Sequence, residues 1–424
     1  MRGNQYWRLL RDNRDYRYLW LGQLVSLLGD WFNLIASAAL VSSLTSSGLA
    51  LGSLFAIRML APFLVSPLAG VLADRYNRTR ILIGTDVIRG VAVLGFLLVR
   101  EPSHVWLLYT LTAIQLGLSG FFFPARSAIL PDLVREEEIG TANIIGSVTW
   151  SSMLAGGAAL GGIVAGVWGN EIAFIADAAT FGLSAVLVAF VRYRPPARPQ
   201  RSEGFADSLA RSAIHEYLDG LRYLGHHAHV LVISLHKAAS ALLVTGMQIV
   251  QVAIAEDAFV IGANGSVGLG LMYGIAGVGT GLGPIVARMW TGDRHRALSW
   301  AMVWAYLISI VGLAVAATMH SFGVVLLGVF LRGLGGGTVW VFSTQLLLEV
   351  VPERVRGRVF ATEFALFSLL SAVGLWLTGA TLDAGAGLSE AMLWMAVLMA
   401  GPALLWTLWL RGSRSGPRAD ATAA

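Results

Sequence analysis

The sequence predicts an all-α membrane protein with twelve transmembrane helices in two pseudo-symmetric six-helix bundles. Hydrophobic residues make up 56% of the 424-residue chain and charged residues only 13%, whereas soluble domains contain about 25% charged residues. Apolar stretches of roughly 20 residues, the length that crosses a bilayer, recur along the chain. Short motifs also recur about half a chain apart, as two related bundles require.

The first 190 residues predict the N-terminal bundle and a segment that precedes it. Residues 1–17 are basic and partly aromatic, which favours an amphipathic helix on the inner leaflet. The next apolar run is too long for a signal-peptide core and should remain uncleaved. The bundle covers residues 18–190, with helices expected at about 18–40, 49–69, 81–99, 105–123, 141–168 and 171–190.

A polar linker over residues 191–229 is expected to separate the bundles and to contain a surface helix at about 205–224. His226, His227 and His229 lie in this linker without an acidic cluster, so they predict a solvated patch rather than a metal site. The C-terminal bundle covers residues 230–410 and a polar tail covers 411–424. Its helices are expected at about 230–252, 266–287, 298–318, 322–347, 359–380 and 390–410.

The placement of arginine sets the predicted orientation. Cytoplasmic loops of membrane proteins carry an excess of Lys and Arg, and the loops assigned to the outside contain only Arg100. Both termini and the linker are therefore expected in the cytoplasm. The loops assigned there contain Arg75, Arg78, Arg80, Arg126, Arg135, Arg192, Arg194, Arg198, Arg201, Arg211, Arg222, Arg288, Arg294, Arg296, Arg354, Arg356 and Arg358.

The segment over residues 70–80 lies between the second and third apolar stretches and reads G-x-L-A-D-R-x-x-R-x-R. We expect a short, arginine-rich hairpin there. The pattern resembles the loop 2–3 motif of the major facilitator superfamily. This resemblance implies the major facilitator fold. It also implies that Asp74 and the arginines of this segment hold the two halves of a transporter together in one of its conformations. The residues that match the motif are Gly70, Asp74, Arg75, Arg78 and Arg80.

Other loops extend the resemblance and the repeat. Residues 123–126, 130–134 and 351–359 resemble the branch of the superfamily that contains the enterobactin exporter and macrolide efflux proteins. Residues 131–134 also match 352–355, and residues 283–296 form a degenerate copy of the loop 2–3 motif that lacks the acidic residue. The loops add Arg126, Arg356, Gly357 and Arg358 to the expected gating residues.

The fifth predicted helix contains a glycine motif over residues 157–162. It resembles the G-P-x-x-G-G motif of drug:proton antiporters, with Ala158 in place of the proline. Gly157, Gly161 and Gly162 would also allow close helix packing without any antiporter role. Both interpretations stay open at the level of sequence.

Charged side chains within the apolar stretches are candidate functional residues, because a charge at the bilayer centre costs about 2.5–3.5 kcal/mol on insertion scales. Asp30 and Arg58 fall near the middle of two neighbouring helices, so we expect a direct or water-bridged pair. Asp30 is the favoured proton-carrying carboxylate, with a structural clasp as the alternative. Asp86 and Arg89 are three residues apart and can pair on one helix face, near the cytoplasmic end where snorkelling is easy.

Four further polar residues complete the candidate site. Asp177 is expected toward the outside, where water can reach it. Gln115 lies where many proton antiporters of the superfamily place an arginine. Arg332, near the middle of the tenth helix, is expected either to face an anionic substrate or a carboxylate, or to pack against backbone carbonyls. Glu363 should form a local ion pair with the arginines that precede it.

These features predict a proton-driven secondary exporter of drug-like or secondary-metabolite compounds. An importer of a small nutrient would need more polar helices than these, and a siderophore or lipid exporter is an alternative. No G-x-x-x-x-G-K-[ST] motif is present, so ATP is not the expected energy source. We expect no enzyme activity, cofactor, metal or nucleic-acid partner. The expected protein is a monomer in a bacterial plasma membrane, with a small-molecule substrate, protons and lipid as partners.

Introduced cysteines test the topology, because the chain has none of its own. Ser202→Cys in the linker and Ser413→Cys in the tail should resist a membrane-impermeant thiol reagent in intact cells and react after lysis. Ser103→Cys, in a loop assigned to the outside, is the control that should label in intact cells. Labelling of position 202 or 413 from outside would overturn the predicted arrangement.

Overall fold

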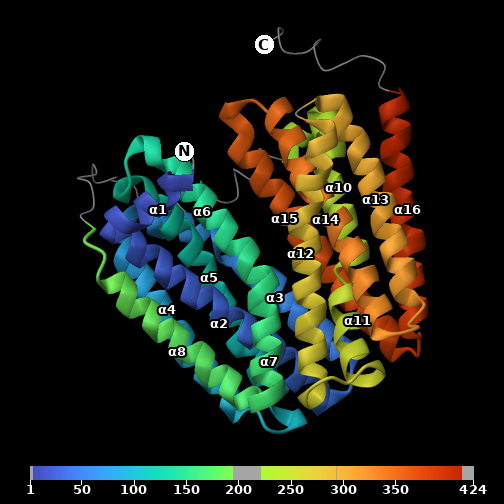
Figure 1. Cartoon of the computed structure of the whole chain (residues 1–424), viewed down its shortest axis with the longest axis horizontal. Coiled ribbons are helices and arrows are strands. Elements are labelled where there is room, and N and C mark those ends of the chain that lie inside the picture. The colour runs from blue at the N-terminus through green and yellow to red at the C-terminus, as the bar shows by residue number, and fades with distance from the viewer. Residues whose placement is uncertain (1–2, 194–220, 293, 413–424) are drawn as a thin grey trace. The chain divides into compact units, whose positions relative to one another are not determined.

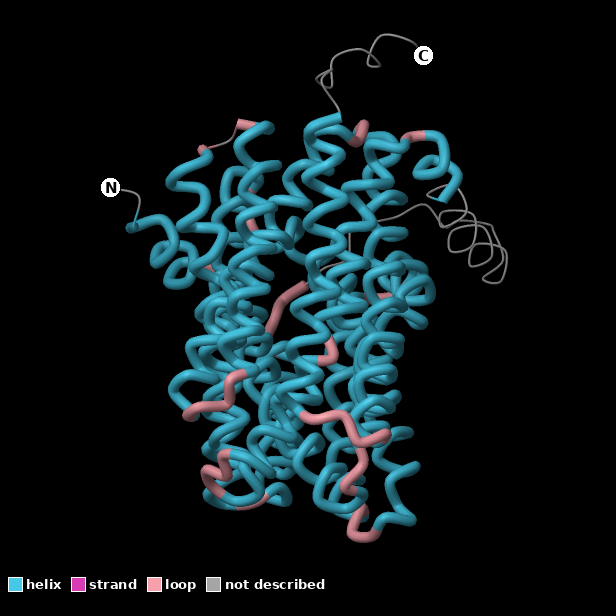
Figure 2. The backbone as a smooth tube through the Cα atoms, turned by 90° about the vertical axis from the view of Figure 1, so that its right-hand side faces the viewer, coloured by secondary structure: helices cyan, strands magenta, loops and turns pink. Residues whose placement is uncertain are grey.

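The computed structural model describes residues 3–193, 221–292 and 294–412. Regular structure in this part of the chain is helical throughout, and short turns join the helices (Figure 2). Twelve of the described helical segments are long and apolar enough to cross a membrane. The predicted all-α membrane fold is therefore confirmed. The predicted surface helix at 205–224 lies mostly outside the described residues.

Contacts among the helices divide the chain into two compact units. Unit 1 consists of residues 1–215 and 252–274, and unit 2 consists of residues 216–251 and 275–424. Residues 252–274 thus pack with unit 1 although the chain on either side of them belongs to unit 2.

Unit 1 contains the first six spans, and several of them are joined by very short turns (Figure 1). Its helices are α1 (Gly3–Asp12), α2 (Arg14–Thr45), α3 (Gly48–Arg75), α4 (Arg78–Leu94), α5 (Val105–Leu133), α6 (Ile139–Ser152), α7 (Ala158–Trp168) and α8 (Asn170–Ala189), with a π-helical turn (Met153–Gly157) that joins α6 to α7.

The remaining six spans contain the helices of unit 2. They are α10 (Ala228–Val244), α11 (Met247–Ala253), α12 (Ser266–Thr291), α13 (His295–Ala317), α14 (Phe322–Val350), α15 (Glu353–Asp383) and α16 (Leu388–Gly412). The first part of α12, up to residue 274, packs with unit 1.

Several helices continue beyond their apolar stretches. α3 runs to Arg75 and α4 begins at Arg78, so the hairpin predicted over residues 70–80 is a two-residue turn. Asn77 in this turn accepts a 3.0 Å hydrogen bond from the backbone N–H of Thr79 and thereby caps α4. α5 likewise ends at Leu133 rather than at residue 123. Hydropathy marks only the apolar part of a helix, and these polar turns are still helical.

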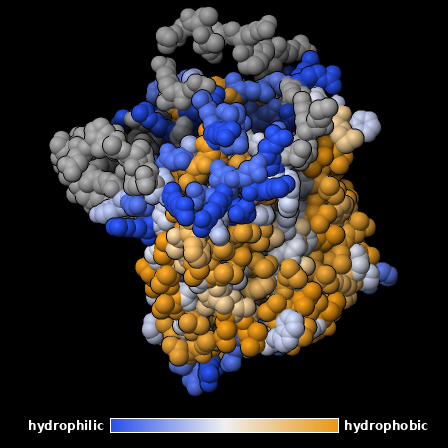
Figure 3. All heavy atoms as spheres, turned by 60° about the vertical axis from the view of Figure 1, so that its left-hand side comes forward, coloured by the Kyte–Doolittle hydropathy of each residue, from blue (hydrophilic) through white to orange (hydrophobic). Residues whose placement is uncertain are grey.

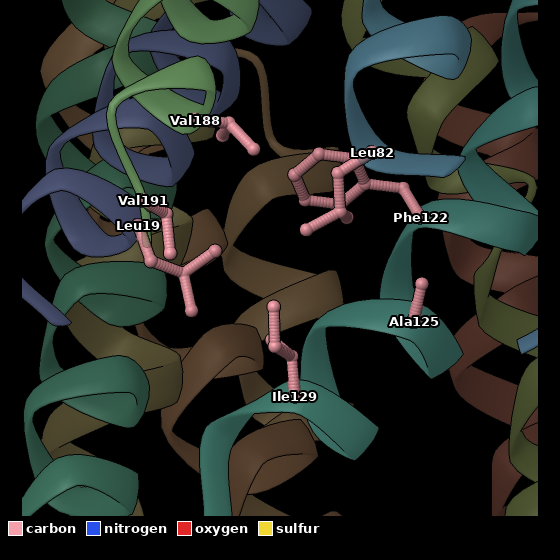
Figure 4. Close-up of a cluster of buried hydrophobic side chains, with 7 residues drawn as sticks. All are labelled: Leu19, Leu82, Phe122, Ala125, Ile129, Val188 and Val191. Carbon is pink, nitrogen blue, oxygen red and sulfur yellow. The ribbon is translucent and has the colours of Figure 1, made fainter. Parts of the chain in front are cut away.

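The interior of unit 1 is apolar where α2, α4, α5 and α8 meet. Figure 4 shows side chains from these helices converging on one cluster. Its buried members are Leu19, Leu82, Phe122, Ala125, Ile129, Val188 and Val191. Nearby, α1 docks on unit 1 through Leu9, which is buried against Leu130 and Ile145, while Trp7 is exposed.

Glycines bring the helices of unit 2 close together. A Cβ atom at Gly335 on α14 would overlap with the Ala305 carbonyl of α13, and one at Gly337 would overlap with the Thr280 carbonyl of α12. Small residues at such contacts are how membrane helices pack without a hydrophobic driving force between them.

The outer surface is suited to lipid. Figure 3 shows apolar side chains over the middle of the visible face and hydrophilic side chains gathered at its upper end. Exposed apolar residues of unit 1 include Val91 and Val167, and those of unit 2 include Leu405. A soluble protein rarely exposes so much contiguous apolar surface.

Candidate functional site

A buried ionic cluster lies within the membrane-spanning part of unit 1. Arg89 on α4 donates through Nη2 to both carboxylate oxygens of Asp30 on α2, at 2.8 and 3.0 Å. Its Nη1 atom lies 3.6 Å from Oδ1 of Asp86, one turn earlier on α4. The guanidinium carbon also lies 4.1 Å from the centre of the Phe181 ring on α8. One guanidinium group therefore serves two carboxylates.

The contact between Asp86 and Arg89 confirms the predicted pairing across one turn, but the expected snorkelling is wrong. Their side chains are 0% and 2% exposed, and the Ser184 hydroxyl of α8 donates to Oδ2 of Asp86 at 2.6 Å. α8 packs against this face of α4. The arginine therefore reaches into the unit, where its counter-ions lie, rather than toward the interface.

The predicted direct ion pair between Asp30 and Arg58 is not formed. Arg58 on α3 donates instead to Oδ1 of Asn33, at 3.4 Å, one turn beyond Asp30 on α2. α2 packs mainly against α8, which also packs against α4, and it makes little contact with α3. The helix that follows α2 in sequence is therefore not the helix that supplies its counter-ion.

Asp177 on α8 is the third carboxyl group of the cluster. Its side chain is fully buried, which corrects the expectation of a hydrated position. Gln115 on α5 lies between two of the acids, with Nε2 at 3.5 Å from Oδ2 of Asp177 and 3.4 Å from Oδ1 of Asp30. Gly29 faces the Asp177 carboxyl group, where a Cβ atom would overlap with it and with the Thr180 hydroxyl.

Unit 2 contains a buried pair that joins two helices. Glu363 on α15 lies 3.0 Å from Nζ of Lys237 on α10, so its expected pairing with the arginines of its own helix is wrong. Lys237 also donates to Thr344 at 2.6 Å and lies 4.6 Å from the Trp340 ring centre. Sequence reasoning missed Lys237, although its being the only lysine in the chain was a signal. Arg332 is half-buried on α14.

The loop 2–3 motif contributes one buried arginine to unit 1. Arg78 is 5% exposed and donates 2.6 Å hydrogen bonds to the Asp132 carboxylate and the Ala128 carbonyl at the end of α5. Burial raises the pKa of Tyr193, whose hydroxyl keeps its proton and donates to Asp132 at 3.1 Å. Arg80 is exposed. Gly70, Asp74 and Arg75 are not among the residues whose side chains are described.

The other expected gating residues are divided between the two units. Arg126 on α5 lies beside Gly146 on α6, where a Cβ atom would be 3.1 Å from Nη2 of the arginine. In unit 2, Arg356 donates to the Leu348 carbonyl at 3.1 Å. Gly357 and Arg358 are exposed on α15.

The glycine motif of the fifth span is a site of close packing within unit 1. A Cβ atom at Gly157 would lie 2.7 Å from the Trp31 ring, and one at Gly161 would lie 2.9 Å from the Trp31 carbonyl. A Cβ atom at Gly162 would lie 2.6 Å from the Ser266 carbonyl at the start of α12. Each glycine therefore lets α7 or the turn before it touch another helix.

The comparisons with known proteins identify the family. A sequence model of the Major Facilitator Superfamily matches residues 19–261, more than half of the chain. The chain belongs to the Major Facilitator Superfamily. This major facilitator is a secondary transporter with many membrane-spanning helices, and it is not an enzyme.

Curated relatives of this major facilitator extend over both units. The uncharacterized MFS-type transporter YfiS of Bacillus subtilis (strain 168) is 26% identical over 385 residues, covering 87% of this chain and 86% of YfiS. The putative bacilysin exporter BacE of Bacillus amyloliquefaciens is 26% identical over 358 residues, covering 84% of this chain and 86% of BacE.

Solved structures share the fold of this major facilitator at low identity. A bacterial homolog to the human lysosomal transporter Spinster aligns with a TM-score of 0.73 and 16% identity over 94% of this chain and 97% of that chain. A bacterial homologue of the iron transporter ferroportin aligns with a TM-score of 0.63 and 17% identity over 94% of this chain and 98% of that chain.

Removing Arg89 should destabilise unit 1 strongly, because it leaves the buried Asp86 and the partly buried Asp30 without their shared cation. We expect Arg89→Ala to lower the free energy of unfolding by about 3–5 kcal/mol, measured by thermal or denaturant unfolding of purified protein. Arg80→Ala, at an exposed position of the same helix, is the matched control and should stay within about 0.5 kcal/mol of the wild type. Equal stability of the two variants would contradict the assigned role of Arg89.

Proposed function

We propose that this major facilitator is a proton-coupled exporter of drug-like or secondary-metabolite compounds. It acts by alternating access as a monomer in a bacterial plasma membrane, with both termini in the cytoplasm. The single observation that carries the proton coupling is the buried cluster of Asp30, Asp86, Asp177 and Arg89.

Energetics favours a functional use of this cluster. A charged residue near the bilayer centre costs about 2.5–3.5 kcal/mol on insertion scales, and such residues are associated with ion and proton pathways. The Asp86 and Asp177 side chains are fully buried, whereas Asp30 is 24% exposed. A partly exposed acid beside buried ones suits a group that exchanges protons with water while its neighbours remain shielded.

Two observations favour export of bulky compounds. The BacE relatives, which align over 84% of this chain, are described as exporters, and the match extends over both units. The helices are also rich in apolar and aromatic residues, with 14 Trp and 18 Phe in the chain. Ligand cavities for apolar compounds are lined mainly by such residues.

The loop 2–3 motif is proposed to gate this cycle. Arg78 joins the start of α4 to the end of α5 through Asp132, which keeps the motif at a fixed place on unit 1. Arg80 of the same motif is exposed, and a charge pair formed by an exposed side chain contributes only about 0–1 kcal/mol. Two transport states that are close in free energy still shift measurably with such an increment.

A drug-sensitivity panel tests the proposed function directly. Expression in a pump-deficient bacterial host should raise the inhibitory concentration of at least one bulky, largely apolar compound, and an uncoupler should abolish the effect. Inverted membrane vesicles should accumulate the same compound when their lumen is acidic. Cells that carry the empty vector are the control.

Two results would contradict the proposal. Increased sensitivity of the expressing cells would indicate import, and accumulation that survives collapse of the pH gradient would exclude proton coupling.

A further inference from the structure

The ionic cluster of unit 1 does not balance its own charge. It contains three carboxyl groups, Asp30, Asp86 and Asp177, but only two guanidinium groups, Arg58 and Arg89. All five belong to membrane-spanning helices. With every acid ionised, the cluster would hold one negative charge in excess. An uncompensated charge in a medium of low dielectric constant is strongly unfavourable, and such a group takes up a proton instead.

The contacts indicate which acid holds this proton. Asp30 receives two hydrogen bonds from Arg89, at 2.8 and 3.0 Å. Oδ2 of Asp86 receives a hydroxyl hydrogen bond from Ser184 at 2.6 Å, and its Oδ1 atom, which accepts no hydrogen bond, lies 3.6 Å from Nη1 of Arg89. Both arrangements stabilise an ionised carboxylate. The proton is therefore not expected on either of these two acids.

Asp177 lacks comparable partners. Among the described residues, no guanidinium nitrogen lies within 4.0 Å of its carboxyl group, and its Oδ1 atom has no hydrogen-bond partner. Its polar neighbours at hydrogen-bond range are neutral amides: Nε2 of Gln115 lies 3.5 Å from Oδ2, and the Asn33 side chain lies beside the carboxyl group. Its side chain is 0% exposed, so bulk water does not replace the missing donors.

The described helices around Asp177 offer it no further cation. α2 presents Asp30 and Asn33, α3 presents Arg58, α4 presents Asp86 and Arg89, and α5 presents Gln115; Tyr273 of α12 faces Arg58. The two arginines are the only cations in this described set. Arg89 contacts both Asp30 and Asp86, whereas Asp177 has no such contact among the described residues, which makes it the acid in excess.

We propose that Asp177 holds the transported proton, and that the positive charge of a monovalent organic cation replaces it when substrate binds. This deepens and rests on the proposed function as a proton-coupled exporter. When the cation enters, the O–H bond of the Asp177 carboxylic acid breaks, the carboxylate remains, and the proton leaves. The net charge of the cluster is unchanged, so one proton exchanges for each positive charge.

Gln115 is the positioning residue in this exchange. Its amide lies within 3.5 Å of both Asp177 and Asp30, so it holds the buried acid beside the partly exposed one. Gly29 permits this approach, because any side chain there would overlap with the Asp177 carboxyl group. The proton on Asp177 is thus one side chain away from Asp30, which is 24% exposed.

Infrared spectroscopy of the purified full-length protein tests the proton site. At neutral pH, the difference between wild-type and Asp177→Asn spectra should contain the carbonyl band of a protonated carboxylic acid. Asp132→Asn, at a carboxylate outside the cluster, is the control and should retain the band. Asp177→Glu should keep a band at a shifted frequency. An Asp177→Asn spectrum that retains the full band would overturn the proposal.

The ligand class is tested with two probes of similar shape. Tetraphenylphosphonium, a bulky monovalent cation, should remove the Asp177 band from wild-type protein, and uncharged triphenylphosphine oxide should leave it. This measurement uses the wild-type chain, so it stands even where Asp177→Asn folds poorly. A band that is unchanged at saturating tetraphenylphosphonium would overturn the exchange.

A transport assay distinguishes the proposed proton site at Asp177 from the proposed function as a proton-coupled exporter. In proteoliposomes, Asp177→Asn should lose accumulation of tetraphenylphosphonium driven by a pH gradient, so that the concentration ratio falls to one, while downhill flux continues. If the wild-type band responds to the cation but no pH gradient drives transport, the proton site is supported and the proposed exporter function is wrong. If the gradient drives transport equally in Asp177→Asn, the exporter is supported and the role of Asp177 is overturned.

Discussion

The double interaction of Arg89 with Asp30 and Asp86 is the constraint on which the ionic cluster of unit 1 depends. It joins α4 to α2 inside a membrane-spanning unit, and Ser184 and Phe181 of α8 complete its surroundings. Buried ion pairs contribute little net stability compared with apolar packing, but removal of one partner is costly. The cluster is therefore better explained by a functional role than by a contribution to folding.

The two units differ in how they balance buried charge. In unit 2, Lys237 and Glu363 form a one-to-one pair between α10 and α15, with Thr344 and Trp340 beside the ammonium group. This pair is neutral when both groups are ionised. In unit 1, three acids share two guanidinium groups, so a proton or another cation is needed for neutrality. The proposed coupling site is therefore in the first half of the chain, although the major facilitator fold repeats a six-helix pattern in both halves.

The fold could be predicted from the sequence because three independent features, hydropathy, arginine placement and the loop 2–3 motif, all indicate the same twelve-helix arrangement. The helix ends could not be predicted, since polar turns such as those that end α3 at Arg75 and α5 at Leu133 are helical without being apolar.

The candidate acids could be predicted because charges are rare in membrane helices. Most of their partners were not predicted. Arg58 was expected to pair with Asp30 because α3 follows α2 in sequence, but α8 packs against both α2 and α4 and so brings Arg89 of α4 to Asp30. Similarly, Glu363 is matched by Lys237, more than 120 residues away, and not by its own helix.

The ionic cluster of unit 1 contains one acid more than its two arginines can neutralise. The most direct test counts the protons released when tetraphenylphosphonium binds to purified protein in weakly buffered solution near neutral pH. The wild type should release one proton per cation bound, and Asp177→Asn should release none. Binding of the cation to the wild type without proton release, or unchanged release from Asp177→Asn, would contradict this expectation.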